Sequence, residues 1–181
     1  MKKLILVGGT MGAGKSTVCE ALLPMLAPAA YLDGDWCWRM APFTVTEENR
    51  RMVLANIGHL LRSYLHNSSF AAVLFCWVMQ EEEIWNAVLR EVEGCEFELH
   101  KVCLTLNETA LRERILKDVA AGKREIEVME RSVQRLPLYG RVSAAKLNVS
   151  FMDGEEAART IAREVQKPFG KFFIENGLTK K

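Results

Sequence analysis

Apolar residues along the chain recur in two alternating patterns. Apolar runs of strand length lie at 4–8, 29–32 and 70–77, an alternating strand pattern lies at 97–106, and a last strand is expected near 147–151. Between them, apolar residues recur three and four positions apart, which is the spacing of one helix face. The strand runs are apolar enough to be covered on both faces, as in a parallel sheet. The pattern predicts an α/β fold, a three-layer α/β/α sandwich around a five-stranded parallel sheet with right-handed crossovers.

Prolines and capping residues mark where helices should begin and end. Pro24 is expected to end or kink the first helix, and Pro137 to end a charged helical segment over 124–135. Thr44 opens a capping box for a helix that runs to about His66. These signals divide the chain into alternating strands and helices, with no segment of linker composition before the tail at 168–181.

Length, composition and charge favour one domain. With 181 residues, 49% of them apolar, the chain can fill a single core, so residues 1–181 are expected to form one domain. The formal net charge is +1 with both signs well mixed, which disfavours generic binding to nucleic acids or membranes. The five cysteines form no C-x-x-C pair and are expected to be reduced, and no apolar stretch reaches the length of a membrane span. We expect a cytoplasmic protein, either a monomer or a homodimer.

A glycine-rich segment links the first strand to the first helix. Its sequence is Gly9-Thr10-Met11-Gly12-Ala13-Gly14-Lys15-Ser16. Glycines let the backbone curl closely around an anion, so that successive N–H groups and the helix N-terminus point toward it. Lys15 can then reach the β- and γ-phosphates of a nucleotide, Ser16 can bind Mg²⁺ and Thr17 can contact the α-phosphate. The motif and its strand–loop–helix context predict a phosphate-binding loop.

Two carboxylates, Asp33 and Asp35, flank a glycine directly after the second strand. Ligands of such sheets sit beyond the carboxyl ends of the strands, so this segment and the phosphate-binding loop should face one crevice. One carboxylate could bind Mg²⁺, and the other could orient or deprotonate a substrate hydroxyl. We assign the magnesium to Asp33 and the acceptor hydroxyl to Asp35. An ordinary Asp-Gly turn is the alternative interpretation.

Two signatures of other phosphate-loop proteins are missing from the sequence. The strand at 73–77 ends without the acidic residue that many of them use to hold magnesium, so Ser16 and the Asp-Gly-Asp pair would carry the metal. The chain also lacks the Asn-Lys-x-Asp sequence that specifies guanine, which argues against a GTPase switch. Phosphoryl transfer to a small molecule is therefore the leading chemistry.

Basic residues gather on and just after one helix: Arg112, Arg114, Lys117, Lys123 and Arg124. A mobile lid could bring one or two of them onto a transferring phosphoryl group, where a guanidinium spreads its charge over the oxygens. Arg114 is the first candidate and Arg124 the second. The alternative is a solvated helix face whose cations pair with Glu113 and Asp118.

Aromatic and basic residues directly follow Asp35. Trp36 and Trp38 could stack on a sugar or a base of the substrate, and Arg39 could pair with an anionic group. Packing in the core is the alternative role for the tryptophans. The three histidines show no metal-ligand spacing with one another or with the cysteines.

These motifs together resemble a known group. Gly9 to Ser16, Tyr31-Leu32-Asp33-Gly34-Asp35 and Leu111-x-x-Arg114 are similar to the small phosphate-loop kinases of the nucleoside-monophosphate-kinase type. That group includes shikimate, gluconate and adenylylsulfate kinases and antibiotic phosphotransferases. The resemblance implies the P-loop NTPase fold, with ATP and Mg²⁺ as cosubstrates. It also implies acceptor-site helices at about 36–68 and a lid at about 110–136.

The chain departs from these relatives where they bind their acceptors. Gluconate kinases usually have a histidine soon after the Asp-Gly-Asp, where this chain has Trp36-Cys37-Trp38-Arg39. Adenylylsulfate kinases usually place an arginine three residues after the second Asp, where this chain has Trp38. The second lid arginine of the group falls on Asp118. The resemblance therefore does not transfer an acceptor to this protein.

The sequence thus predicts an ATP-dependent phosphotransferase that moves the γ-phosphoryl group to a hydroxyl or phosphate of a small molecule or nucleotide. The expected catalytic residues are Lys15, Asp33, Asp35 and Arg114. An ATP-binding module that hydrolyses ATP slowly, in a regulatory or resistance role, is the alternative. A polynucleotide kinase is a third possibility, disfavoured because backbone binding needs clustered Lys and Arg.

Overall fold

The computed structural model describes residues 1–167. Strands and helices alternate along them, as the apolar pattern predicts. The elements are β1 (Lys2–Gly9), α1 (Lys15–Met25), β2 (Ala29–Asp33), the short 3-10 helix η1 (Gly34–Trp38), α2 (Glu47–His66), β3 (Ala72–Trp77), α3 (Glu82–Glu91), β4 (Phe97–Thr105), α4 (Glu108–Ala120), α5 (Val128–Tyr139), β5 (Ala145–Asn148) and α6 (Gly154–Gln166). The predicted tail at 168–181 lies outside the described residues.

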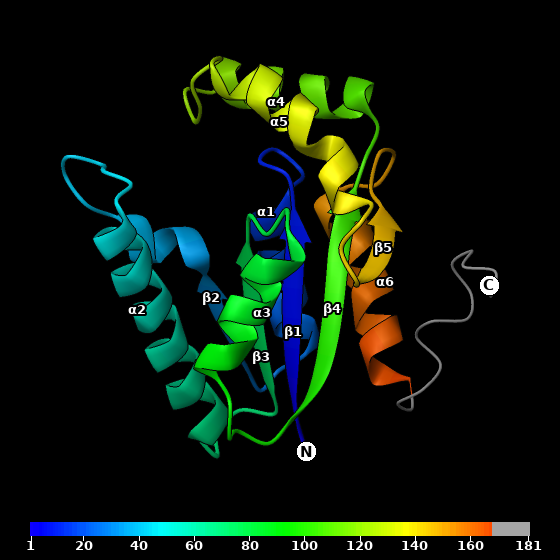
Figure 1. The fold of residues 1–181 in the computed structure, drawn as a ribbon. Coiled ribbons are helices and arrows are strands. Elements are labelled where there is room, and N and C mark those ends of the chain that lie inside the picture. The colour runs from blue at the N-terminus through cyan, green and yellow to red at the C-terminus, as the bar shows by residue number, and fades with distance from the viewer. Residues whose placement is uncertain (168–181) are drawn as a thin grey trace.

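The five strands form one parallel sheet in the order β2-β3-β1-β4-β5. This confirms the predicted fold class. Because all strands run in the same direction, their carboxyl ends meet at one edge of the sheet (Figure 1). The loops after β1 and β2 therefore open on the same edge, although β3 lies between the two strands.

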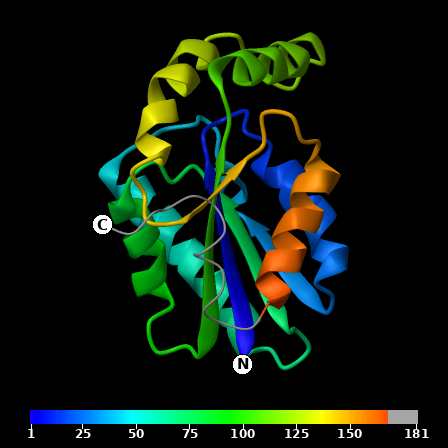
Figure 2. The same cartoon turned by 90° about the vertical axis from the view of Figure 1, so that its right-hand side faces the viewer.

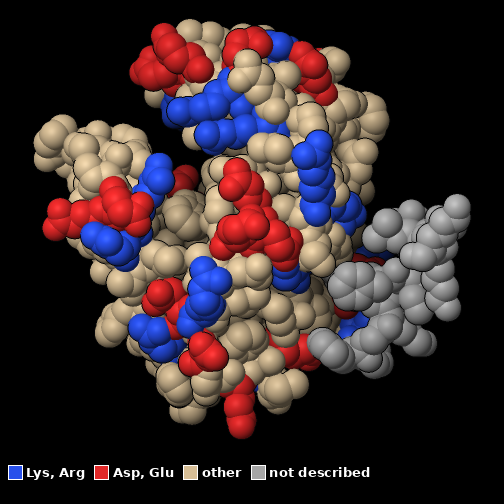
Figure 3. Space-filling model, viewed as in Figure 1, with Lys and Arg blue, Asp and Glu red and all other residues tan. Residues whose placement is uncertain are grey.

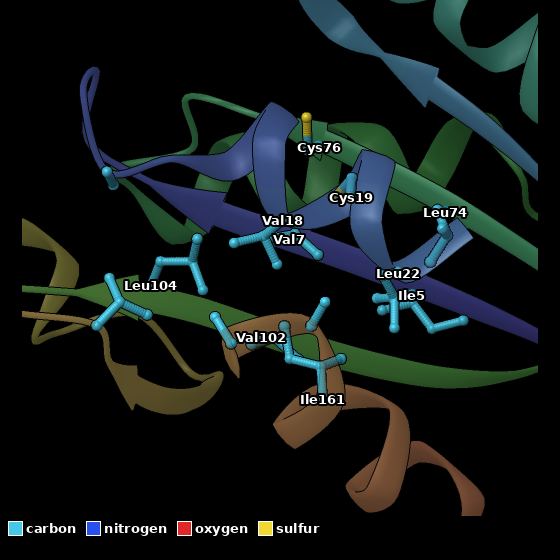
Figure 4. Close-up of a cluster of buried hydrophobic side chains, with 14 of the residues drawn as sticks. Ile5, Val7, Val18, Cys19, Leu22, Leu74, Cys76, Val102, Leu104 and Ile161 are labelled. Atoms are coloured by element: carbon cyan, nitrogen blue, oxygen red, sulfur yellow. The ribbon is translucent and has the colours of Figure 1, made fainter. Parts of the chain in front are cut away.

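Two apolar cores cover the two faces of the sheet. Side chains alternate between the faces along a strand, so Ile5 and Val7 of β1 point to one core and Leu4 and Leu6 to the other. The first core packs against α1 and α6 (Figure 4) and the second against α2 and α3. Figure 2 shows α1 and α6 on one side of the sheet and α3 on the other. The resulting three layers hold β1, and the loop that follows it, at the centre of the molecule.

Helices α4 and α5 lie across the carboxyl edge of the sheet instead of along a face (Figures 1 and 2). Buried residues of both helices, among them Ile115 and Met129, belong to the same core as α1. The segment predicted as a lid is thus anchored by apolar packing at its base. Among the described residues, no helix is long and apolar enough to cross a membrane.

Three helix ends differ from the prediction. Helix α2 begins at Glu47 with Thr46 as its N-cap, whereas the sequence predicts Thr44 in that role. The charged segment was expected to stop at Pro137, but α5 begins at Val128 and continues through Pro137 to Tyr139. Helix α1 likewise continues through Pro24 to Met25. Each proline removes one backbone hydrogen bond, but it lies only one or two residues before the helix end, so its effect is confined to the last turn.

Gly8 provides a test of the packing beneath the site. A Cβ at this position would lie 2.3 Å from Cζ2 of Trp85, which is fully buried and donates its indole N–H to the Met79 carbonyl at 2.8 Å. We expect Gly8→Ala to lower the free energy of unfolding by about 1–3 kcal/mol, measured by urea denaturation, because the held ring cannot move aside. At Gly140 the nearest atom to an added Cβ is 3.4 Å away, so Gly140→Ala is the matched control and should change stability by less than about 0.5 kcal/mol. Equal effects of the two substitutions would contradict this packing.

Candidate active site

The phosphate-binding loop joins the central strand to α1. Gly12 and Gly14 have φ angles of +86° and +91°, a backbone conformation that favours glycine. A Cβ on Gly12 would also lie 2.7 Å from Cγ1 of Ile115, so α4 packs directly on the loop. No side chain of the described residues caps the start of α1. The N-terminal N–H groups of this helix are therefore available to an anion, as in other phosphate-binding loops.

A cavity of about 510 Å³ opens above the loop, within the size range of small-molecule sites. Five parts of the chain line it: the loop and the first residues of α1, the segment after β2 through Asp35, Val78 directly after β3, the predicted lid, and the segment that leads into α6. The lining residues are Met11, Gly12, Ala13, Gly14, Lys15, Ser16, Thr17, Val18, Asp35, Val78, Arg114, Lys117, Asp118, Lys123, Arg124, Val149, Met152, Asp153, Gly154 and Ala157. Most of the residues predicted to bind a nucleotide are among them.

Two residues predicted to contact the nucleotide do not line the cavity, namely Gly9 and Thr10. Thr10 is buried, and its hydroxyl donates to the Ser132 carbonyl of α5 at 3.1 Å. Its own carbonyl accepts from the Lys15 ammonium at 3.1 Å. Thr10 therefore connects the loop to α5 through its hydroxyl and holds the Lys15 ammonium through its carbonyl.

Lys15 is buried at the floor of the cavity. Burial lowers the pKa of its ammonium group, and the Cys76 thiol and the carboxylates of Asp35 and Asp33 oppose that shift. These acidic neighbours favour the charged form of Lys15, which is the form that can hold a phosphate.

Asp33 is the centre of a hydrogen-bond cluster at the end of β2. Its Oδ2 accepts from the Ser16 hydroxyl at 2.6 Å and from the Tyr31 phenol at 3.1 Å, and its Oδ1 accepts from the Asp35 backbone N–H at 3.0 Å. Burial raises the pKa of Tyr31, so the phenol stays protonated and remains a donor. The structure thus brings together Ser16 and Asp33, the two residues predicted to hold Mg²⁺.

The donor set at Ser16 and Asp33 suits magnesium, which prefers oxygen ligands and retains several waters. Within residues 1–167 there is no group of three or more His, Cys, Asp or Glu that could hold a metal. A magnesium ion at this point would therefore complete its coordination with phosphate oxygens and water.

Asp35 borders the cavity and is exposed to it. The surrounding protein displaces part of its hydration, which raises the pKa of the carboxyl, and the charge of Asp33 raises it further. Lys15 opposes these two effects. Asp35 thus faces open space and has a raised pKa, two properties that suit a proton acceptor.

The two arginines predicted for the lid occupy different environments. Arg114 donates to the carbonyls of Ala13 and Met152, both at 2.9 Å, and to that of Val149. It therefore ties the phosphate-binding loop to the segment before α6. Arg124 pairs with Asp118 at 3.2 Å at the rim of the cavity. Both border the cavity, but most of the donors of Arg114 are already engaged by backbone carbonyls.

The residues predicted to form a substrate wall lie outside the lining of the cavity. Trp36 and Arg39 are exposed, whereas Trp38 is half-buried and packs against Phe43 with ring centroids 5.8 Å apart. Trp36 makes an edge contact with the ring of Tyr31 at 5.2 Å. Trp36 is thus joined through Tyr31 to Asp33.

Sequence reasoning missed the segment before α6 as part of the site. Val149, Met152, Asp153 and Gly154 line the cavity, and a Cβ on Gly154 would lie 2.7 Å from Cγ2 of Thr17. The one signal in the sequence was the capping box of Asp153 and Glu156, which fixes the start of α6 but does not reveal its neighbour.

Comparisons with known proteins identify the family and the fold of the chain. A protein-family model described as an AAA domain matches residues 5–132, which include the phosphate-binding loop, Asp33, Asp35 and both lid arginines. The chain belongs to this family. A search of curated proteins finds no match for this chain.

Solved structures with the same fold include several kinases. A gluconokinase from Sinorhizobium meliloti 1021 is similar, with a TM-score of 0.65 and 21% sequence identity. The match covers 90% of this chain and 91% of the gluconokinase chain. APS kinase from Mycobacterium tuberculosis gives 0.64 at 17% identity, over 90% and 96% of the two chains. Shikimate kinase from Bacteroides thetaiotaomicron gives 0.56 at 19% identity, over 89% and 97%. These structures confirm the predicted P-loop kinase fold, and at this identity they show the fold alone.

We expect the Tyr31 phenol to hold the Asp33 carboxylate in position. Tyr31→Phe removes one of the two donors to Asp33 Oδ2 and keeps the ring. We expect the apparent affinity for Mg²⁺ in the presence of ADP, measured by calorimetry, to fall about three- to tenfold, as loss of one hydrogen bond allows. Tyr64→Phe on α2, whose ring packs against Phe70, is the matched control. An unchanged magnesium requirement in Tyr31→Phe would show that the phenol does not position the carboxylate.

Proposed function

We propose that the protein is an ATP-dependent kinase that transfers the γ-phosphoryl group to a hydroxyl or phosphate of a small molecule. The observation that carries this proposal is the meeting of Lys15, the Ser16–Asp33 pair and Asp35 beside one cavity. A buried cation, a pair of oxygen ligands for a metal and an exposed carboxylate are parts that recur in phosphoryl-transfer sites. The family match supports the nucleotide half of the proposal.

The residues divide into a donor half and an acceptor half. The loop N–H groups and Lys15 hold the phosphates of ATP, while Arg114 keeps the loop in place through the Ala13 carbonyl. Mg²⁺, when bound at Ser16 and Asp33, neutralises phosphate charge. The acceptor enters between the segment at about 36–68 and the lid at about 110–136. Asp35 lies at the boundary between the two halves.

The chemical step exchanges one bond to phosphorus for another. The bond between the γ-phosphorus and its bridging oxygen breaks, and the electron pair leaves with ADP. The acceptor oxygen forms the new bond, and its proton passes to the Asp35 carboxylate. Lys15 stabilises the charge that develops on the phosphoryl oxygens, and Arg124 reaches the same region when its pair with Asp118 opens. Transfer to water instead of an acceptor would correspond to the alternative function, a slowly hydrolysing ATP-binding module.

Loss of Lys15 tests the donor half. We expect Lys15→Ala to lower the rate of ADP release from ATP by at least about 100-fold, because its charge is preorganised at the cavity floor. The rate is measured with a coupled assay, with and without an acceptor mixture. Lys2→Ala is the control and should retain the wild-type rate, because Lys2 lies at the start of β1, at the end of the strand away from the loop. A Lys15→Ala variant with undiminished phosphotransfer would exclude the proposed site.

Loss of Asp35 tests the acceptor half through pH. The carboxyl accepts a proton only when ionised, and its pKa is raised, so wild-type activity should fall as pH decreases through that raised pKa. Asp35→Asn should lose about 10²- to 10⁴-fold in kcat and should lack this acidic limb. Glu93→Gln, an exposed substitution, should keep both the rate and the limb. If Asp35→Asn retained the wild-type pH profile, Asp35 would not be the proton acceptor.

A further inference from the structure

Large apolar side chains are exposed beside the acceptor half of the site. They come from η1, from the connection between η1 and α2, and from the start of α2. We call the following four residues the apolar platform: Trp36, Phe43, Val45 and Met52, with exposed fractions of 51%, 66%, 49% and 44%. The connection between η1 and α2, residues 39–46, contains one charged residue, Arg39. An exposed apolar surface of this kind usually marks a place where something binds.

The platform is held in place by contacts on its inner side. The ring of Phe43 packs on Trp38 at 5.8 Å, and the side-chain amide of Asn49 donates to the Thr44 carbonyl at 2.8 Å. The hydroxyl of Thr46 caps α2 by accepting from the Asn49 N–H at 3.1 Å. The exposed side chains thus project from a segment that is fastened to α2.

The platform is also continuous with the reacting groups. Trp36 follows Asp35 directly, and its ring contacts Tyr31, whose phenol donates to Asp33. Figure 3 shows an uncharged projection at the upper left of the molecule, with charged side chains directly below it, across a hollow from the Lys and Arg side chains beneath α4 and α5. A ligand in that hollow would meet cations on the lid side and apolar surface on the other.

We propose that the phosphoryl acceptor is a hydroxyl compound with an apolar, ring-sized body, which lies on the platform while its hydroxyl reaches Asp35. This inference rests on the proposed kinase function and names the class of its acceptor. The lid cations match the phosphates of ATP, whereas the platform offers apolar surface in place of polar partners. A polyhydroxylated acceptor would lose its hydration there without replacement hydrogen bonds, while an apolar body gains from burial. Arg39 borders the platform and accommodates one anionic group on the same compound.

A screen of two matched sets of hydroxyl compounds tests the acceptor class. One set contains sugars, sugar acids and polyols, and the other contains alcohols of similar size with an aromatic or branched apolar body. ADP release is measured with ATP and Mg²⁺ for the wild type and for Lys15→Ala. We expect Lys15-dependent stimulation to be concentrated in the apolar set. Stimulation by the polar set alone would overturn the acceptor class and leave the kinase function standing. No stimulation by either set would overturn both.

Variants of the platform connect any active compound to this surface. With the best compound of the apolar set, Phe43→Ser should raise KM about tenfold or more with less than a threefold change in kcat, because a buried ring contributes to binding and not to the chemical step. Phe43→Leu should restore most of the affinity. Phe70→Ser, whose half-buried ring packs on Tyr64 beyond the other end of α2, is the matched control and should leave KM unchanged. Equal KM values for Phe43→Ser and the wild type would overturn the proposal.

A second copy of the chain is the competing occupant of the platform. Sedimentation of the wild type and Phe43→Ser over a range of concentrations distinguishes it. Our proposal expects the same association state for both proteins. A wild-type dimer that Phe43→Ser dissociates would assign the platform to self-association and contradict the acceptor role.

Discussion

The hydrogen bond between the Ser16 hydroxyl and the Asp33 carboxylate joins two segments that the sheet keeps apart. Ser16 lies in the first turn of α1, the helix after β1, and Asp33 ends β2, with β3 between these two strands. The bond spans that gap at 2.6 Å because parallel strands bring their carboxyl ends to one edge. Displacement of either residue would break the link that fixes the phosphate-binding loop relative to the segment after β2.

The surrounding charges depend on this connection. Lys15 is buried where an unpaired ammonium would be costly, and Asp33 and Asp35 supply the opposing negative charge. Partial burial raises the pKa of the Asp35 carboxyl, and the nearby charge of Asp33 raises it further. Asp33 is buried and accepts three hydrogen bonds, whereas Asp35 is exposed to the cavity, so two carboxylates separated by one glycine have different surroundings.

Sequence reasoning reached the parts of the site that are local in the chain. Gly9 to Ser16 and Asp33 to Asp35 each carry their meaning in adjacent residues, and the order of strands and helices placed them at one edge. The sequence alone did not predict contacts between segments that are distant in the chain. The hydrogen bonds of Arg114 to Ala13 and Met152, and that of Thr10 to Ser132, join residues far apart in sequence and depend on side-chain direction. The packing of Trp38 on Phe43 likewise follows from the path of an irregular connection, which no periodicity encodes.

The fate of the γ-phosphoryl group of ATP tests the central claim most directly. The protein is incubated with Mg²⁺, a mixture of small hydroxyl compounds and ATP that carries radioactive phosphorus at the γ-position, and the products are separated by chromatography. Phosphotransfer at the Lys15–Asp33–Asp35 site predicts that the label moves to an organic compound in the mixture as ADP forms. Label recovered only as inorganic phosphate would contradict a kinase and identify the protein as an ATP-hydrolysing module.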